Sequence, residues 1–306
     1  MKNSHTAHIL ILLISISTLQ IVRGQQQLQF TQYMYNPLSL NSGYASANRF
    51  DVTLMHRSQW VGLDGAPTSQ ALTLSGRTGE RIGLGLMVLN DNVGPANQVD
   101  INAAFSYSIP INANVRMSLG LNGGFDILNV DWSKGNYADP QDPIFNNDLN
   151  NIRPIIGAGA YFYGEKWYAG ISTPNFVRTE TFNDEEQLVI DKDTHFYLMG
   201  GYVLDLGPQL KLKPTTLLKY VEGAPITVDV SANFLIQEKF SAGAAYRFND
   251  AMSAMVGLYL SERFFVGYAY DHTTTALNRY NDGSHEIIIR YLLPDAKARA
   301  RSPRFF

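Results

Sequence analysis

The end of the sequence holds the arrangement of residues that most resembles a catalytic site. Ser284, His285 and Glu286 are consecutive, and Asp271 and His272 lie shortly before them. A Ser/His/acid set is what a membrane-embedded lipase would use to activate a serine nucleophile. Adjacent residues of a β-strand point to opposite faces, however, so Ser284 and His285 cannot meet as nucleophile and base. We therefore expect no catalytic residues, and we interpret these side chains as part of a polar network.

Two acidic segments could supply oxygen ligands to a metal ion. Calcium binds where several carboxylate or carbonyl oxygens converge, but neither segment has the spacing of a known calcium loop. We interpret both as solvated loops and expect no metal or other cofactor. The first segment, 131–151, contains Asp131, Asp139, Asp142 and Asp148; the second, 174–193, has six acidic residues against Arg178 and Lys192, a net charge of -4.

The segment QWVGLDGAP, which begins at Gln59, combines turn residues with side chains that a partner could contact. Its two glycines and its proline suit a tight reversal of the chain. The same segment could instead fold inward or be presented to a partner, and the sequence leaves these alternatives open. The residues that we single out as a candidate structural or partner motif are Gln59, Trp60, Gly62, Asp64, Gly65, Pro67, His285 and Glu286.

The composition excludes several functional classes. The chain has no cysteine, which removes disulfides, thiolate catalysis and Cys-ligated zinc. Its net charge of -3 gives no overall basic character for nucleic acid. The 17 Tyr and 16 Phe, in contrast, suit β-strands and the aromatic girdles of a membrane barrel.

Apolar and polar residues alternate with a period of two along much of the chain. In segment 226–236, Ile226, Val228 and Val230 begin an apolar series that alternates with polar residues, with Leu235 as an apolar exception. A helix would need apolar residues at spacings of three and four. The alternation predicts that one face meets lipid and the other a polar lumen. The expected lipid-facing residues include Val115, Leu119, Phe125, Val228, Val230 and Phe234, and the expected lumen residues include Arg116, Asn122, Asp126, Asp229, Asn233, Arg247 and Arg290.

The pattern predicts an all-β protein, a closed antiparallel transmembrane barrel of about fourteen strands. Short connections alternate with the long segments 131–151, 174–193 and 272–283, as in outer-membrane barrels, whose periplasmic turns are short. An even strand number then puts both chain ends in the periplasm. The expected strands are 49–60, 68–76, 81–91, 97–109, 114–130, 152–164, 166–173, 194–205, 209–220, 225–236, 238–248, 251–260, 262–271 and 284–293.

The two ends of the chain differ from this pattern. Residues 1–24 read as a signal peptide with a short apolar stretch, and we expect cleavage between Gly24 and Gln25. Residues 25–48 carry turn signals and are expected to tuck into the lumen as a plug-like segment before the barrel domain, 49–293. Residues 294–306 read as a basic periplasmic tail.

Five segments together resemble the PorP/SprF family of outer-membrane proteins, from the type IX secretion and gliding machinery of the Bacteroidetes. The resemblance covers nearly the whole mature chain. The segments are FTQYMYNPLSLNSGYA from Phe30, RSQWVGLDGAPTSQ from Arg57, GLGLMVLNDNVGP from Gly83, LKLKPTTLLKYVEGAPITVDVSANFLI from Leu210 and GYAYDHTTTALNRYNDGSHEIIIRY from Gly267.

The resemblance implies a non-enzymatic protein of the outer membrane. Its implied partners are the lipid bilayer, envelope proteins of the type IX system and a secreted adhesin, whose export or surface anchoring it would support. The alternative is a diffusion channel or a transporter of small or hydrophobic substrates. The polar residues expected in the lumen argue against a purely apolar pocket, but they are compatible with a polar pore.

Overall fold

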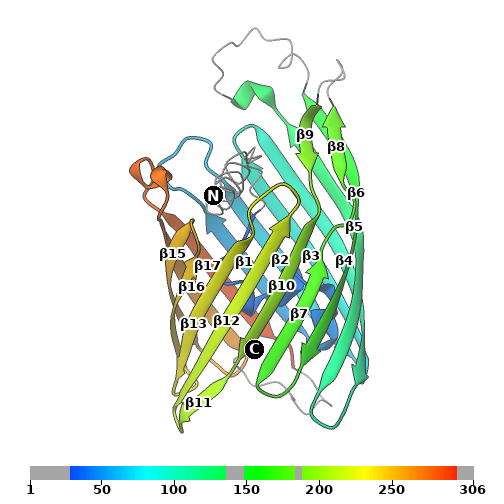
Figure 1. The fold of residues 1–306 in the computed structure, drawn as a ribbon, viewed down its shortest axis with the longest axis vertical. Helices are drawn as coiled ribbons and strands as arrows, with labels where there is room; N and C mark the ends of the chain where they lie inside the picture. Colours follow the sequence, from blue (N-terminus) through cyan, green and yellow to red (C-terminus); the bar gives the residue numbers. More distant parts are fainter. Residues whose placement is uncertain (1–27, 136–147, 183–187, 295–306) are drawn as a thin grey trace, which may run out of the picture.

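The computed structural model describes residues 28–135, 148–182 and 188–294, which form a closed antiparallel β-barrel (Figure 1). The predicted signal peptide, with its cleavage between Gly24 and Gln25, and the predicted basic tail lie outside the described residues. The strands are β1(Asp51–Ser58), β2(Thr68–Thr78), β3(Ile82–Val93), β4(Ala96–Pro110), β5(Arg116–Val130), β6(Leu149–Tyr163), β7(Trp167–Thr173), β8(Thr179–Phe182), β9(Leu188–Lys192), β10(His195–Tyr202), β11(Leu204–Gly207), β12(Leu210–Val221), β13(Thr227–Ile236), β14(Phe240–Arg247), β15(Ala251–Tyr259), β16(Phe264–Thr273) and β17(Ser284–Leu292).

Closure comes from two pairings. The first strand pairs with the last, with Asp51 opposite Leu292, and β10 pairs with β12 on the other side of the barrel. Strand β11 continues β10 after Val203, so the two fill the position of one barrel strand. All fourteen predicted barrel strands are confirmed, with ends that agree within three residues.

Two short strands were not predicted. Strands β8 and β9 pair with each other in a separate two-stranded sheet within segment 174–193. The interpretation of segment 174–193 as a solvated loop did not include these two strands. The hairpin extends beyond the barrel at the end that carries the long connections (Figure 1).

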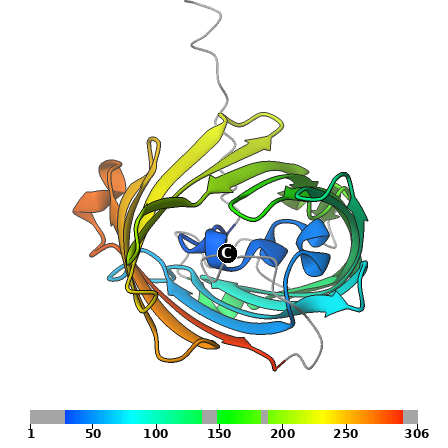
Figure 2. The ribbon, with the colours of Figure 1, turned by 90° about the horizontal axis from the view of Figure 1, so that it is seen from below.

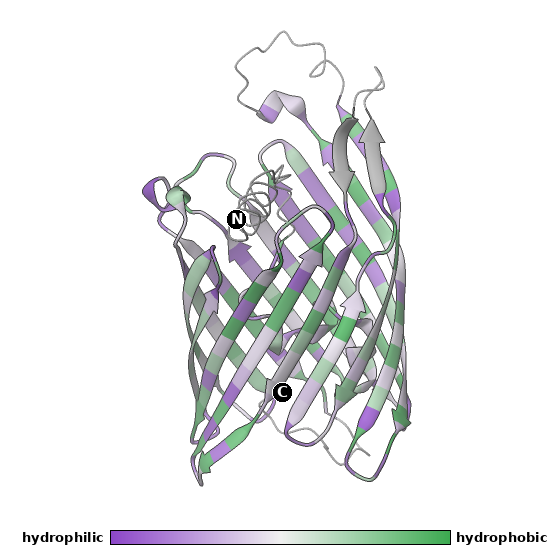
Figure 3. Ribbon diagram, in the orientation of Figure 1, coloured by the Kyte–Doolittle hydropathy of each residue, from purple (hydrophilic) through white to green (hydrophobic). Residues whose placement is uncertain are grey.

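The predicted faces of the wall are confirmed for the residues that lie within strands. Leu119, Phe125, Val230 and Phe234 point outward and are exposed, and Figure 3 shows the alternation along the strands. Val115 precedes β5 and Val228 lies near the start of β13, and both are half-buried. On the inner face, Arg116 and Asn122 are half-buried, and Asp126, Asp229, Asn233, Arg247 and Arg290 are buried.

The barrel begins and ends at the same edge. The start of β1 and the end of β17 lie beside the short connections 79–81, 164–166, 208–209 and 237–239. The long connections, including 131–148 and 274–283, lie at the opposite edge. The alternation of connection lengths is therefore confirmed, while the assignment of the short-turn edge to the periplasm remains a prediction. Among the described residues, no helix has the length and apolarity needed to cross a membrane.

Substituting Val230 tests the outward face. Val230 lies near the middle of β13 with its side chain outside the barrel. We expect Val230→Arg to lower the free energy of unfolding by about 2 to 4 kcal/mol, because a guanidinium near the bilayer midplane is poorly solvated. Denaturant unfolding in lipid vesicles measures the change, with Val230→Leu as the control. A change as small as that of the control would contradict the assignment.

Candidate functional site

Residues 28–48 occupy the interior of the barrel and are called the plug below (Figure 2). They form three short 3-10 helices, η1(Tyr33–Tyr35), η2(Pro37–Ser39) and η3(Ser42–Ser46), in the segment where the sequence carries turn signals. Pro37 begins η2, and the Asn41 side chain caps η3 by accepting a hydrogen bond from the Gly43 amide. Local turn chemistry thus folds the plug into a compact unit.

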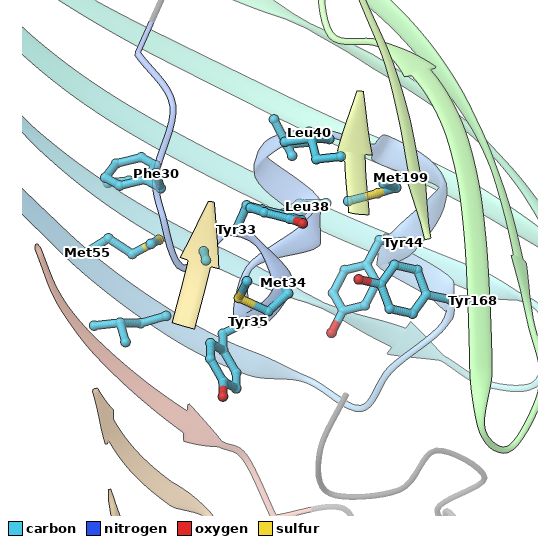
Figure 4. Close-up of a cluster of buried hydrophobic side chains, with 14 of the residues drawn as sticks. Phe30, Tyr33, Met34, Tyr35, Leu38, Leu40, Tyr44, Met55, Tyr168 and Met199 are labelled. Atoms are coloured by element: carbon cyan, nitrogen blue, oxygen red, sulfur yellow. The ribbon is translucent and has the colours of Figure 1, made fainter. Parts of the chain in front are cut away.

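The plug is buried along almost its whole length. Residues 29–38 and 40–46 are all buried, and Tyr33 and Met34 are each only 1% exposed. Their side chains form one apolar cluster with inward-pointing residues of the wall (Figure 4). Leu235, the apolar exception in the alternation of β13, is one of these wall residues and is 1% exposed. Such exceptions mark where the wall contacts the plug.

A row of small residues on the inner wall forms the seat of the plug. The row crosses five neighbouring strands, in which each residue lies opposite the next. A Cβ atom at Gly83 would collide with the backbone at Ser46, and one at Gly120 would collide with the backbone at Gly43. Glycine is therefore needed at these positions for close backbone approach. The members of the row are Gly83, Ser106, Gly120, Gly159 and Ser172.

Asn41 fixes the plug against the same part of the wall. Its Nδ2 donates to the carbonyl oxygens of Ala160 and Ile171, at 3.1 and 3.3 Å. The hydroxyl of Ser172 donates to the Leu40 carbonyl oxygen at 2.8 Å. These bonds satisfy polar groups that would be costly to bury without partners.

On the other side of the lumen, Glu286 binds the plug backbone. Its carboxylate accepts hydrogen bonds from the amides of Thr31 and Gln32, at 2.8 and 2.9 Å. Arg57 lies 3.4 Å from the same carboxylate and 2.7 Å from Asp271, and all three charged side chains are at most 3% exposed. A buried carboxylate with this many donors is well compensated, because charge-assisted hydrogen bonds replace its hydration.

Two further ion pairs connect the wall to the plug. Arg290 pairs with Asp51 at 2.6 Å and donates to the Tyr44 hydroxyl at 3.1 Å. Arg247 pairs with Asp229 at 3.1 Å, and Gln29 donates to the same aspartate at 3.4 Å. The polar lumen residues predicted from the alternation thus hold the plug as well as one another.

The structure separates the residues of the apparent catalytic set. Ser284 and Glu286 point into the barrel and are buried, whereas His285 points outward and contacts the Tyr268 hydroxyl through Nδ1 at 2.6 Å. Ser284 Oγ accepts a hydrogen bond from the Trp60 amide at 3.1 Å. The expectation that the serine and the histidine occupy opposite faces is confirmed. His285 and Glu286 therefore do not form one site.

The segment Gln59–Pro67 lies at the long-connection edge and does not fold into the lumen. Its two ends meet through a hydrogen bond from the Gln59 amide to the Pro67 carbonyl oxygen, at 2.9 Å. Gly62 and Gly65 have positive φ angles of 95° and 72°, as the turn interpretation requires. Asp64 is exposed. The segment also pairs with neighbouring connections, because the Val61 amide donates to the Gly283 carbonyl oxygen and the Gly94 amide donates to that of Gly65.

Only part of the first acidic segment is described. Asp139 and Asp142 lie outside the described residues, and the Trp132 amide donates to Asp148 at 3.2 Å. Hydrogen bonds from the Ser133 hydroxyl and then from Lys134 hold the pKa of Asp131 below its usual value. Among the described residues, no group of three or more His, Asp or Glu side chains is arranged to hold a metal ion.

One feature of the lumen was not predicted. A cavity of about 350 Å³, called the vestibule below, lies between the plug and the wall toward the long-connection edge. The plug residues Phe30 and Tyr33 line it, together with Asp91, Asp100 and Arg153 of the wall. Alternation alone predicts that each of these wall residues lies on the inner face. That they line one cavity follows only from the strand register and the position of the plug.

Substituting Gly120 tests the seat of the plug. We expect Gly120→Leu to displace residues 42–46 and to lower the free energy of unfolding by about 1 to 3 kcal/mol, as overpacking does. Hydrogen exchange of the amides of residues 41–46 measures the displacement. Gly123→Leu is the matched control, because Gly123 is exposed on the outer face of the same strand with no heavy atom nearer than 3.8 Å to its Cβ position. Equal exchange in both variants would contradict the model of the seat.

Substituting Glu286 tests the second attachment. Glu286→Gln removes the charge that two plug amides and Arg57 share, and the new amide group would place a donor against other donors. We expect a loss of about 3 kcal/mol in the free energy of unfolding and faster exchange at residues 29–35. Glu222→Gln, an exposed position, is the control. Unchanged exchange at residues 29–35 would show that Glu286 does not hold the plug.

No curated protein matches the chain. Among solved structures, the chain is similar to the CymD monoaromatic hydrocarbon channel, with 12% identity over 87% of this chain and 92% of that one and a TM-score of 0.49. It is also similar to the Acinetobacter baumannii outer membrane protein Omp33, with 10% identity over 81% and 100% and a TM-score of 0.45. At such TM-scores neither likeness carries an argument about ligands.

The sequence itself matches a family model. The model is described as Type IX secretion system membrane protein PorP/SprF, and it matches residues 22–291. This range includes the plug and all but the last residue of the barrel strands. The chain therefore belongs to the PorP/SprF family of type IX secretion system membrane proteins.

Proposed function

We propose that this protein supports the export or surface anchoring of a partner protein, such as a large adhesin, by the type IX secretion and gliding machinery of the Bacteroidetes. The family and the barrel fold place the chain in the outer membrane. Within that setting, the protein acts through protein contacts and performs no catalysis.

The observation that carries this proposal is the seated plug. Buried apolar contacts, a glycine-rich seat and charged hydrogen bonds to Glu286 attach it to opposite sides of the lumen. A lumen occupied in this way does not suit free diffusion of solutes. The surfaces left for specific contacts are then the long connections, the vestibule and the short-turn edge.

The absence of catalysis is supported by the separation of Ser284 and His285 on opposite faces of β17. The candidate motif residues Gln59–Pro67 support a contact role instead. They form a connected, partly exposed surface with segment 281–284 and Gly94 at one edge of the barrel. The basic tail, 294–306, is the candidate contact at the other edge, where it would attract an acidic periplasmic partner over roughly a Debye length of 8 Å.

Deleting the gene separates this proposal from the channel alternative. We expect general permeability to small solutes to stay unchanged, while a type IX substrate or surface adhesin fails to reach or remain on the cell surface. Surface proteomics and solute uptake in the deletion strain measure the two effects, and the wild-type gene supplied in trans is the control. Normal display of every type IX substrate, together with lost uptake of a small solute, would favour the channel.

A further inference from the structure

The outer face of β1 to β4 changes from apolar to polar toward the long-connection edge. Leu54, Leu72 and Ile101 belong to one row of opposed residues across these strands, and all three are exposed on the outside. Closer to the long-connection edge, most outward residues of the same strands are polar and uncharged, with histidine counted as neutral. Six of them are joined by side-chain hydrogen bonds and are called the amide patch below: His56, Ser58, Gln70, Asn90, Asn92 and Asn97.

Strand register and hydrogen bonds fix the side chains of the amide patch. Gln70 lies opposite both His56 of β1 and Asn90 of β3, and its Oε1 accepts a hydrogen bond from Asn90 Nδ2 at 2.8 Å. Asn92 lies opposite Asn97 of β4. Asn97 Nδ2 donates to the Oδ1 atoms of Asn90 and Asn92, at 2.8 and 2.6 Å. Side chains held in this way lose less conformational entropy when a ligand binds to them.

The hydrogen bonds of the amide patch leave both a donor and an acceptor for a ligand. In the part of the chain that the structure describes, no hydrogen-bond partner lies at Asn92 Nδ2 or at Asn97 Oδ1. Both side chains point outward and are half-buried. The patch can therefore donate to and accept from a molecule beside the barrel, as the two ends of a carboxamide group do.

A second sector of the same edge has a different outer face. Tyr220 near the end of β12, Tyr246 near the end of β14 and Met252 near the start of β15 are exposed on the outside. Aromatic residues form the girdles at which a barrel wall meets the lipid headgroups. The amide patch occupies the strand ends of its own sector, where amides facing acyl chains would be costly. A polar neighbour therefore suits this part of the wall.

The chemistry of the amide patch favours a saccharide over other polar neighbours. The hydroxyl groups of a sugar both donate and accept hydrogen bonds, so they match the amides. Phosphate and carboxylate groups are bound most strongly by Arg and Lys, and the six residues of the patch include neither. Protein interfaces are typically anchored by Trp, Tyr and Arg, which the patch also lacks.

We propose that the amide patch binds the saccharide headgroup of a glycolipid in the surrounding membrane. Sugar hydroxyls accept from Asn92 Nδ2 and donate to Asn97 Oδ1, while the acyl chains lie along the apolar row that contains Leu54 and Leu72. This inference goes beyond the proposed function and does not depend on it, since it needs only that the outer face of the wall meets lipid.

Native mass spectrometry of the full-length protein, released from detergent micelles, tests the proposal. Three lipids with the same acyl chains are titrated separately: digalactosyldiacylglycerol, phosphatidylcholine and phosphatidylglycerol. We expect digalactosyldiacylglycerol to bind roughly five-fold more tightly than either phospholipid, because only its headgroup is an uncharged saccharide. Equal affinities for the three lipids, or a preference for a phospholipid, would overturn the proposal.

Substitutions locate the binding. The double change Asn92→Ala with Asn97→Ala removes both proposed contacts and should lower the affinity for digalactosyldiacylglycerol to that for phosphatidylcholine. Asn92→Leu removes the spare donor but keeps the hydrogen bonds between Asn90 and its neighbours, and it should also weaken binding. Asn278→Ala, at an exposed amide between β16 and β17, is the control and should leave the affinity unchanged. Folding of each variant is checked by its mobility on unheated SDS gels, and a retained preference for the glycolipid in either patch variant would contradict the assignment.

A partner protein at the amide patch would give a different set of results. In that case the three lipids bind equally, while cells with the double variant lose surface display of a type IX substrate although the barrel is folded. This outcome would overturn the saccharide site and leave the proposed function in place. If the purified barrel prefers digalactosyldiacylglycerol while the deletion strain displays every substrate, the saccharide site stands and the secretion role fails.

Discussion

A closed barrel of fourteen strands encloses more space than its own inward side chains can fill. Eight strands give an interior that side chains just fill, while sixteen to eighteen leave an aqueous channel. Closure itself is compulsory, since an unpaired strand edge in lipid would leave backbone groups without partners. The interior must therefore hold water or another part of the chain, and residues 28–48 occupy much of it. The glycine row, the inward apolar residues and the buried ion pairs all follow from the presence of this segment.

The buried charges illustrate how this constraint shapes the wall. Each ion pair sits where desolvation would be costly, and a buried pair alone is weak support for stability. Here several of the charges also bind the plug, as Glu286 does through two backbone amides and Arg290 through the Tyr44 hydroxyl. The wall and the plug therefore determine each other's conformation. A change to one charged residue is expected to loosen a segment more than two hundred positions away in the sequence.

Much of the fold could be predicted from the sequence because strands and turns depend on residues that are close together in the chain. Alternation with a period of two predicted the strands and their inner and outer faces. Connection lengths predicted which edge of the barrel carries the long connections and which carries the two chain ends. Turn residues such as Asn41 and Pro37 indicated that residues 25–48 are irregular. The β8–β9 hairpin was missed because its strands lie in a segment read only as acidic and solvated.

The contacts between the plug and the wall could not be predicted from local sequence patterns, because they join residues that are distant in the sequence. Gly83, Gly120 and Gly159 lie far apart in the sequence, and nothing local indicates that strand register brings them into one row across four neighbouring strands. Glu286 was singled out beside His285, but its real partners, Thr31 and Gln32, lie some 250 positions earlier. The vestibule likewise depends on the strand register and on the placement of the plug, so it could not be predicted from the sequence.

The attachment of the plug to β17 has a consequence for the order of assembly. Thr31 is among the first residues of the described chain, but the carboxylate that binds its amide belongs to the last barrel strand. The plug therefore cannot be fully bound until the whole chain has been delivered and β17 has reached its place beside β1. Contacts of such high sequence separation are slow to form, because the entropy of closing the intervening loop is lost first. Before β17 is in place, the aromatic residues of the plug lack the wall contacts that bury them. A chaperone-bound or membrane-bound intermediate would shield these residues until the barrel closes.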